Sequence, residues 1–450
     1  MKIDLKEVKK IHFIGIGGIS MSALAKLSIL TGHEVSGSDA VYGGWFRELS
    51  ALGADVAVGL RPEKAAAADL TVYTSAIPDD NVELSAARLL GKPVVARNEF
   101  LHMHEAMYKK SLAVSGTHGK TTVTALLAHI MHEENTNFTA HIGGKPVDGD
   151  NLLFCGKDLF ISEACEYKRA FLSLNPDIAL ILNIECDHPD CYGNEAETVQ
   201  SFNEFIGKIK PGGTLIINGD TSYEKVCIPA HVKTVTFGLS HMNICKAVNV
   251  YERGGSAVFD VLYGDMNIGS IVSPLPGMHN VSNVLAAVCA ALCLSVAPDR
   301  ILQHVHTFKG VERRFEKKCT LNGADIIFDY AHHPSEIAAA IATAKSLCRG
   351  KLRVYFQPHT YSRTKSYFNA FTEALSRAPF LGLVKTYPAR EAPSDGLNAL
   401  DLYSAISKNR SVTYFDELLG VSRHIIKTAA PGDISLLLGA GDIYEVHKLF

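Results

Sequence analysis

The segment "SGTHGKTT" at residues 115–122 contains the residue types of a loop that binds phosphate groups. It lies between an apolar run and an amphipathic run, which predicts a strand, a glycine turn and then a helix. Such a junction aims backbone N–H groups at an anion, while Lys120 reaches the outer phosphates and the Thr121 hydroxyl binds Mg²⁺. Only two residues separate Gly116 from Gly119, whereas the familiar pattern G-x-x-x-x-G-K-[ST] has four. We interpret the segment as a shortened phosphate loop; the alternative is an ordinary glycine turn capped by threonine.

Acidic residues that could hold a metal ion end two later apolar runs. "LFISEACE" places Glu163 and Glu166 at one predicted strand end, and "ALILNIECDH" places Glu185, Asp187 and His188 at another. Because the carboxyl ends of parallel strands meet at one edge of a sheet, we expect these groups near the loop. Mg²⁺ prefers oxygen ligands, so Glu163 and Thr121 are the predicted magnesium pair, and His188 is expected at a second ion or a substrate group.

Less specific interpretations of these residues stay open. Glu163 could be an ordinary carboxylate at a strand end, and His188 could be a solvated loop histidine. Cys186, His188 and Cys191 together suggest a zinc site, but their spacing matches no standard zinc motif.

A second glycine loop, "GIGGIS" at 15–20, also follows an apolar run and precedes a predicted helix. Asp39 ends the next predicted strand, where an acid can bind a ribose hydroxyl. Ser20 departs from the dinucleotide fingerprint, which requires a third small residue for close helix packing. This loop indicates a diphosphate or ribose more firmly than it indicates NAD.

Composition limits the class of protein. The 450 residues are 47% hydrophobic and 20% charged, which predicts two to four domains with their own cores. The formal net charge of -3 gives no general attraction for nucleic acid. Ten cysteines without a CxxC pair, and no apparent secretion signal, favour reduced thiols in the cytoplasm.

One uncharged segment, "VSNVLAAVCAALCLSVA" at 281–297, resembles a membrane span in length. It is rich in alanine and cysteine, and Pro298 is expected to end it. We interpret it as a helix of a protein core, so no membrane partner is expected.

Predicted strands and helices alternate along most of the chain, which is typical of parallel sheets covered by helices. Residues 230–275 instead contain the short alternating runs "VKTVTFG", "SAVFDVLYG" and "MNIGSIVS", which suggest an antiparallel appendage. We therefore predict three α/β domains at 1–105, 106–309 and 310–450.

Taken together, these motifs resemble those of the ATP-dependent Mur ligases, in order and along essentially the whole chain. Besides the two glycine loops, the resemblance rests on "TSAIP", "EACE", "NIECDHPD", "PGMHNVSNVLAA", "GVERRFE", "DYAHHPSEI", "FQPHTYSRT", "YPAREAP" and "GAGDI". It explains why one chain has two nucleotide loops. One loop would hold a nucleotide-linked substrate, and the other would hold the ATP that activates it.

The resemblance implies an N-terminal Rossmann-like domain for a UDP sugar, a central phosphate-loop ATPase domain and a Rossmann-like C-terminal domain for an amino acid. The implied reaction is the ATP-dependent ligation of L-alanine to UDP-N-acetylmuramate through an acyl phosphate, a cytoplasmic step of peptidoglycan synthesis. The implied cofactors are ATP and Mg²⁺, and the protein would be a monomer or homodimer.

The same resemblance assigns roles to individual positions. For the UDP sugar it implies Gly15, Gly17, Gly18, Asp39 and Ser75. For ATP it implies Gly116, Thr117, His118, Gly119, Lys120, Thr121, Thr122, Asn283, Arg314 and Asp329. Catalysis is implied for Lys120, Glu163 and His188, and metal binding for Thr121, Glu163 and His188. For the amino acid it implies Tyr330, His332, His359 and Arg363.

The chain departs from the family pattern at three positions. Cys165 and Tyr167 replace an aspartate and a serine, so neither is expected to be essential. Thr360 stands where many relatives have arginine, which leaves Arg363 as the expected partner of the alanine carboxylate.

Three other functions remain possible from the sequence. A recycling ligase that adds a peptide to the same UDP sugar would share the central motifs. An NAD(P)-dependent dehydrogenase would use only the first loop, and a non-catalytic nucleotide switch would use only the second.

Overall fold

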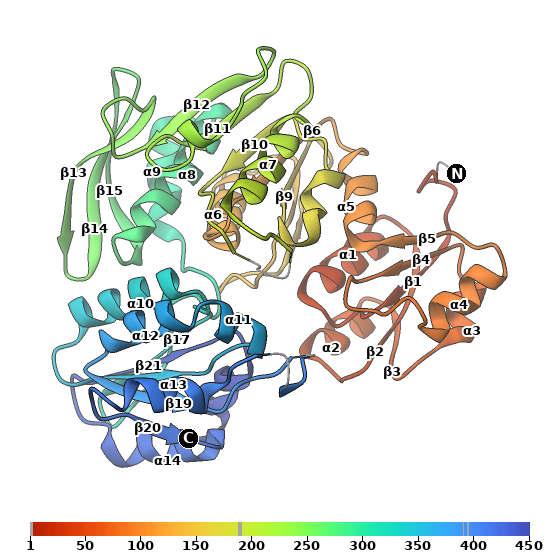
Figure 1. Cartoon of the computed structure of the whole chain (residues 1–450). Helices are drawn as coiled ribbons and strands as arrows, with labels where there is room; N and C mark the ends of the chain where they lie inside the picture. Colours follow the sequence, from red (N-terminus) through yellow and green to blue (C-terminus); the bar gives the residue numbers. More distant parts are fainter. Residues whose placement is uncertain (1–2, 188–190, 390, 394–395) are drawn as a thin grey trace. The chain divides into compact units, whose positions relative to one another are not determined.

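A computed structural model of the chain describes residues 3–187, 191–389, 391–393 and 396–450 (Figure 1). Its elements form two compact units. The first unit contains residues 1–184, 198–245 and 286–304, and the second contains residues 185–197, 246–285 and 305–450. As predicted, this is an α/β protein built on three mainly parallel sheets.

The N-terminal sheet is parallel throughout and has the strand order β3-β2-β1-β4-β5. Four of the five residues of β1 are buried, as expected for a central strand covered on both faces. Strand β1 lies between β2 and β4, so the strand order reverses at its carboxyl end, where α/β proteins bind ligands. The strands are β1 Lys10–Ile14, β2 Glu34–Asp39, β3 Asp55–Val58, β4 Leu70–Tyr73 and β5 Val94–Ala96. The helices are α1 Ile19–Leu30, α2 Gly44–Ala51, α3 Pro62–Ala67, α4 Val82–Leu89 and α5 Arg97–Glu105.

The central sheet places β10 and β9 on either side of β6, in the order β12-β11-β10-β6-β9-β7-β8. All these neighbours pair in parallel except β7 and β8. The strands are β6 Lys110–Ser115, β7 Phe138–His141, β8 Leu152–Phe154, β9 Leu159–Glu163, β10 Ile178–Ile181, β11 Thr214–Asn218 and β12 Lys233–Gly238. The helices are α6 Lys120–Glu133, α7 Glu195–Ile206, α8 His279–Cys293 and α9 Pro298–Thr307, and short 3-10 turns cover Tyr167–Ser173 and Tyr223–Lys225.

The antiparallel appendage is smaller than predicted. The run "VKTVTFG" forms β12, which pairs in parallel with β11 and so extends the parallel sheet. The prediction was wrong because a short alternating run does not indicate the direction of its partner strand. The antiparallel pair is β14 Ser256–Tyr263 with β15 Met266–Pro276, and β13 Cys245–Arg253 lies beside β14.

The apolar segment 281–297 contributes to helix α8, which ends at Cys293, earlier than predicted. Pro298 does not end this helix; it begins α9, a position where its missing N–H is not needed. Residues 284–291 of α8 are buried within the protein. Among the described residues, no helix has both the length and the apolar character needed to cross a bilayer.

The C-terminal sheet has the order β16-β17-β21-β18-β19-β20, with β16 as its antiparallel edge. Alternate residues of β18 face two separate cores: Val354 and Phe356 pack with α10, α12 and α13, whereas Tyr355 packs with α14. The strands are β16 Glu316–Leu321, β17 Ala324–Asp329, β18 Leu352–Phe356, β19 Phe380–Val384, β20 Thr413–Phe415 and β21 Ile434–Leu438. The helices are α10 Pro334–Leu347, α11 Tyr361–Ser366, α12 Phe368–Ser376, α13 Ala399–Ile406 and α14 Leu418–Thr428, followed by a 3-10 segment at Asp442–Leu449.

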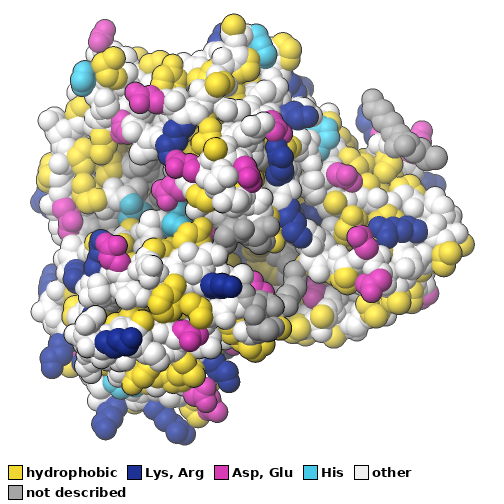
Figure 2. Space-filling view, viewed as in Figure 1, with side chains coloured by type: hydrophobic (Ala, Val, Ile, Leu, Met, Phe, Trp, Pro, Cys, Tyr) yellow, Lys and Arg dark blue, Asp and Glu magenta, His cyan; other side chains and the backbone are white. Residues whose placement is uncertain are grey.

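Charges of both signs are interspersed over the face of the molecule drawn in Figure 2. This distribution agrees with the small net charge of -3. It does not resemble the basic stripe that tracks a nucleic-acid backbone.

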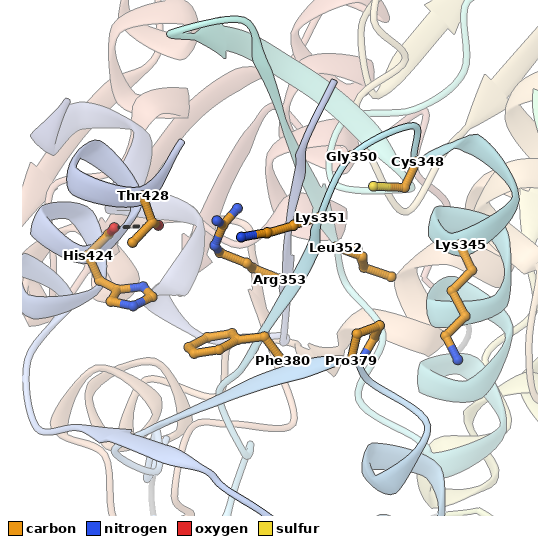
Figure 3. A pocket seen from close by; sticks show the side chains of 10 residues that line it. All are labelled: Lys345, Cys348, Gly350, Lys351, Leu352, Arg353, Pro379, Phe380, His424 and Thr428. Carbon is orange, nitrogen blue, oxygen red and sulfur yellow. Dashed lines mark hydrogen bonds between the residues drawn. The ribbon is translucent and has the colours of Figure 1, made fainter. Parts of the chain in front are cut away.

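A buried ion pair lies at the amino edge of the C-terminal sheet. Arg353 Nη1 is 2.7 Å from Asp433 Oδ2, and Asp433 Oδ1 accepts a hydrogen bond from Lys351 N at 2.7 Å. Burial would raise the pKa of Asp433, but these bonds outweigh it and lower the pKa below its ordinary value. Arg353 also lines a cavity of about 610 Å³, together with Lys351, Phe380 and His424 (Figure 3).

We predict that Asp433→Asn lowers the melting temperature of the C-terminal domain at pH 7. Loss of a charge-assisted pair costs about 2 kcal/mol, or roughly 4–8 °C for a domain of this size. Because the folded pKa of Asp433 is depressed, its contribution is present above the unfolded value near 4 and is lost as the pH falls below it. Calorimetry should therefore show the two proteins converging below about pH 4.

The matched control is Asp416→Asn, because Asp416 forms an exposed pair with Lys385 in the same domain. This substitution should change the melting temperature by less than about 2 °C. Equal losses in both variants would show that the Arg353–Asp433 pair does not stabilise the domain.

Candidate active site

The predicted phosphate loop joins β6 to α6, and both of its glycines are required by local geometry. Gly116 has φ +137° and Gly119 has φ +85°, conformations that other residues adopt only with strain. A Cβ on Gly116 would lie 3.0 Å from Leu182 Cβ and 3.1 Å from Asn183 N. The loop therefore packs directly against the segment that follows β10.

Asn183 fixes the shape of this loop. Its backbone oxygen accepts a hydrogen bond from Thr117 N at 3.2 Å, and its Oδ1 accepts one from His118 N at 2.8 Å. Its Nδ2 donates in return to His118 O at 3.1 Å. Sequence reasoning assigned no role to Asn183, although its place just after an apolar strand, two residues before Glu185, was the available signal.

Lys120 begins α6 and is paired with Glu166, the second of the two acids that "LFISEACE" places at a predicted strand end. Its Nζ lies 2.9 Å from Glu166 Oε2 and also donates to Thr117 O at 3.0 Å. The Lys120 side chain is 14% exposed and that of Glu166 only 3%. Burial alone would lower the pKa of Lys120, but the Glu166 carboxylate outweighs it and raises this pKa. The ammonium is therefore charged, as the predicted contact with the outer phosphates of a nucleotide requires.

The predicted magnesium pair is brought together beside this lysine. Thr121 Oγ1 donates to Glu163 Oε2 at 3.2 Å, and Gly143 N donates to Glu163 Oε1 at 2.6 Å. A Cβ on Gly143 would lie 2.5 Å from Glu163 Oε2, so a larger residue there would displace this carboxylate. Two hard oxygen donors on fixed elements fit Mg²⁺. His188 lies outside the described residues. Its predicted metal role, and the alternative zinc site that it would form with Cys186 and Cys191, therefore stay predictions.

The first glycine loop joins β1 to α1. Gly15 has φ +81°, and a Cβ there would lie 2.7 Å from Thr74 Cγ2. Gly17 N donates to Asp39 Oδ2 at 2.9 Å, and Gly18 precedes the first residue of α1. Asp39 thus supports the loop itself, and its predicted contact with a nucleoside stays a prediction. Ser75 is exposed in the turn after β4.

In the second unit, the ring of Tyr330 lies close to two arginines. The guanidinium carbons of Arg313 and Arg314 are 4.9 Å and 5.0 Å from the centre of the Tyr330 ring. Asp329 ends β17 and accepts hydrogen bonds from Phe315 N at 2.8 Å and from Ala331 N at 2.7 Å. Burial raises the pKa of Asp329 to about 6, although Arg314 opposes this shift.

Two histidines predicted to contact the amino acid lie near this tyrosine. His332 and His359 have ring centres 6.3 Å apart, and His359 stacks on Tyr387. Burial lowers the pKa of His332 to about 3 and that of His359 to about 4. Both rings are therefore neutral at pH 7 and can accept a hydrogen bond from an amine.

Arg363, on α11, forms a buried ion pair in which Nη1 is 2.6 Å from Asp187 Oδ1. The amino end of α11 is held by Glu391, whose Oε2 accepts from Tyr361 N at 2.7 Å and from Ser362 N at 2.8 Å. Thr360 precedes α11 with φ +64° and ψ 152°, a conformation that is strained for threonine. Neither Glu391 nor the strain at Thr360 could be read from residue types.

Asn283 lies on α8, where its Nδ2 donates to Asn280 Oδ1 at 2.8 Å. The structure thus assembles the phosphate loop with Thr121 and Glu163, and separately assembles Gly15, Gly17 and Asp39. The contacts above also group Arg314 with Tyr330, and His332 with His359. The ligands of all these groups remain predictions.

Comparisons with known proteins agree along the full length of the chain. Residues 10–109 match the Mur ligase family catalytic domain, residues 114–291 the Mur ligase middle domain, and residues 313–441 the Mur ligase, glutamate ligase domain.

Among curated relatives, UDP-N-acetylmuramate--L-alanine ligase from Lachnospira eligens is 40% identical over 99% of both chains. The protein of that name from Clostridium acetobutylicum is 39% identical over 100% of this chain and 99% of its own. Among solved structures, UDP-N-acetylmuramate-alanine ligase from Thermotoga maritima has a TM-score of 0.83 and 26% identity over 98% of both chains. The chain therefore belongs to the Mur ligase family.

Proposed function

We propose that this protein uses ATP to join L-alanine to UDP-N-acetylmuramate, forming UDP-N-acetylmuramoyl-L-alanine for peptidoglycan in the cytoplasm. The observation that carries the proposal is the cluster of Lys120, Thr121 and Glu163 on a glycine loop. It supplies a cation for a triphosphate and two oxygen ligands for the magnesium ion that accompanies it. The names of the full-length relatives support the choice of sugar and amino acid.

Activation of the acid is the first step. A carboxylate does not form an amide with an amine unaided, because oxide is a poor leaving group. An oxygen of the sugar carboxylate attacks the γ-phosphorus of ATP, the bond to the β–γ bridging oxygen breaks, and ADP leaves. Thr117 N and His118 N donate to Asn183, so the N–H groups at the start of α6, with Lys120, hold the phosphates and offset the charge that develops on them. Mg²⁺ bound by Thr121 and Glu163 would add further charge neutralisation there.

Amide formation is the second step. The alanine amine attacks the carbonyl carbon of the acyl phosphate, the bond to the phosphate oxygen breaks, and inorganic phosphate leaves as the amine loses a proton. His332 Nδ1 lies 3.0 Å from Tyr330 O, and because a carbonyl only accepts, this nitrogen carries the hydrogen. Nε2 therefore presents a lone pair. Because its pKa is about 3, His332 is a weak base at pH 7. Its role is therefore to orient the amine by accepting a hydrogen bond, and it does not keep the proton that the amine loses.

The proposal predicts which acceptor supports turnover. With UDP-N-acetylmuramate and ATP, alanine should release ADP and phosphate in equal amounts, and an alanyl-tripeptide should release little. A preference for the tripeptide would instead support a recycling ligase. ADP production that does not depend on any acceptor would support a nucleotide switch, and binding of NAD(P)H would support a dehydrogenase.

We predict that Lys120→Ala lowers phosphate release by at least about 10³-fold, because the transferring phosphoryl group loses its principal cation. The affinity for UDP-N-acetylmuramate, measured by calorimetry, should change by less than about threefold, because the sugar is expected at the first glycine loop. Lys109→Ala is the matched control, since Lys109 is exposed and pairs with Asp158, away from the phosphate loop. Phosphate release at the wild-type rate from Lys120→Ala would refute the role of this lysine.

A further inference from the structure

The amino end of α1 is held by side chains of the central domain. Ser20 Oγ lies 2.9 Å from His141 Nε2, and Asn151 Nδ2 donates to Ile19 O at 2.7 Å and to Ser22 Oγ at 3.0 Å. Helix α1 begins directly after the first glycine loop. These bonds therefore fix the loop as well as the helix. They also explain Ser20, the residue that departs from the dinucleotide fingerprint.

Asn151 is fully buried and uses both ends of its amide. While Nδ2 donates to α1, Oδ1 accepts from Lys26 Nζ at 3.1 Å. Lys26 is 2% exposed, contacts Asp150 at 2.6 Å and Glu48 at 2.7 Å, and lies 4.2 Å from the centre of the Trp45 ring.

Burial of the Lys26 ammonium has a large desolvation free energy. Its ion pairs do not by themselves show that the network stabilises the fold. The network uses directional bonds between two domains, however, and such bonds define a geometry. Hydrophobic contacts of the same area would allow the two domains to slide relative to each other, because they have no preferred direction.

The segment His141–Gly143 of the central domain also contacts Glu163, the predicted magnesium ligand. His141 ends β7 and bonds to Ser20, Ile142 N donates to Asn151 O at 2.9 Å, and Gly143 N donates to Glu163 Oε1 at 2.6 Å. Three consecutive residues thus link the start of α1, the buried asparagine and the predicted magnesium ligand. Only two peptide bonds therefore separate the residue that contacts α1 from the residue that contacts Glu163, which fixes the position of the first glycine loop relative to Glu163.

We propose that Asn151, Lys26 and His141 are positioning residues, which fix the first glycine loop relative to the phosphate loop. The carboxylate of the bound UDP sugar is then in line with the γ-phosphate of ATP. The inference rests on the proposed function, because only a reaction between ligands of the two loops needs the loops to be held at a fixed relative position. In-line transfer is sensitive to distance, and a displacement of 1 Å can slow a reaction about 100-fold. None of the three residues needs to touch a reacting atom.

The direct test is Asn151→Asp, which preserves shape and the acceptor for Lys26 but removes the donor to Ile19 O. Hydroxylamine traps an acyl phosphate as a hydroxamate, so hydroxamate formed from ATP and UDP-N-acetylmuramate without alanine reports the first step alone. We expect this rate to fall about 10- to 100-fold, while the dissociation constants of ATP and UDP-N-acetylmuramate change less than about threefold. Asn137→Asp is the matched control, because Asn137 is exposed and its Oδ1 only accepts a hydrogen bond, from Asp158 N.

Two further pairs of variants test the inference at other positions, in case Asn151→Asp does not fold. His141→Gln keeps a donor toward Ser20 and should retain most of the hydroxamate rate, whereas His141→Leu should lose it. Lys26→Met should behave like Asn151→Asp. Its control, Lys10→Met, removes an exposed lysine that pairs with Glu34 and should have no effect.

An unchanged hydroxamate rate in folded Asn151→Asp and Lys26→Met would overturn the inference. So would parallel losses of rate, substrate affinity and melting temperature, because they would indicate a purely structural role. If the wild-type protein itself forms no hydroxamate and no ADP with its proposed substrates, the proposed function fails first.

Discussion

A charged lysine inside a glycine loop needs a negative partner at all times. In this protein Glu166 supplies that partner, with Nζ of Lys120 2.9 Å from its carboxylate. The ammonium is therefore protonated while it is paired with Glu166, and under the proposed function a triphosphate would replace Glu166 as its counter-charge. Because the exchange is between two anionic partners, the lysine never has to be buried without compensation.

The order of the central strands turns this pair into a site. Four neighbours, β10, β6, β9 and β7, contribute Asn183, the phosphate loop, Glu163 and the His141–Gly143 segment at their carboxyl ends. Each part is held by a bond to the next: Asn183 to the loop, the loop threonine Thr121 to Glu163, and Glu163 to Gly143. A rigid parallel sheet is well suited to this task, since its strand ends lie at one edge.

Residue types and local spacing were sufficient to predict much of this arrangement. The two glycine loops, the lysine and threonine that follow the second, and Glu163 at a strand end all have local signals, and the structure brings Thr121 and Glu163 together as expected. The α/β class followed from the alternation of strands and helices. The motif set indicated the ligase family, and the comparisons confirm it.

Other features depend on contacts between distant segments, which a single sequence does not reveal. Asn151 lies 132 positions from the Ile19 carbonyl it supports, and Arg353 lies 80 positions from Asp433. The strand order 10-6-9-7 does not follow the sequence order, so the partner of Glu163 at Gly143 could not be identified in advance. The run "VKTVTFG" was assigned to the wrong kind of pairing for the same reason: register and direction come from the neighbouring strand.

The most direct measurement of the central claim is a crystal structure with a non-hydrolysable ATP analogue and Mg²⁺. We predict that Lys120 Nζ leaves Glu166 and bonds to the β- and γ-phosphate oxygens, and that oxygens of Thr121 and Glu163 lie about 2.0–2.1 Å from the ion. A nucleotide bound elsewhere, with Lys120 still paired to Glu166 and no ion beside Glu163, would contradict it.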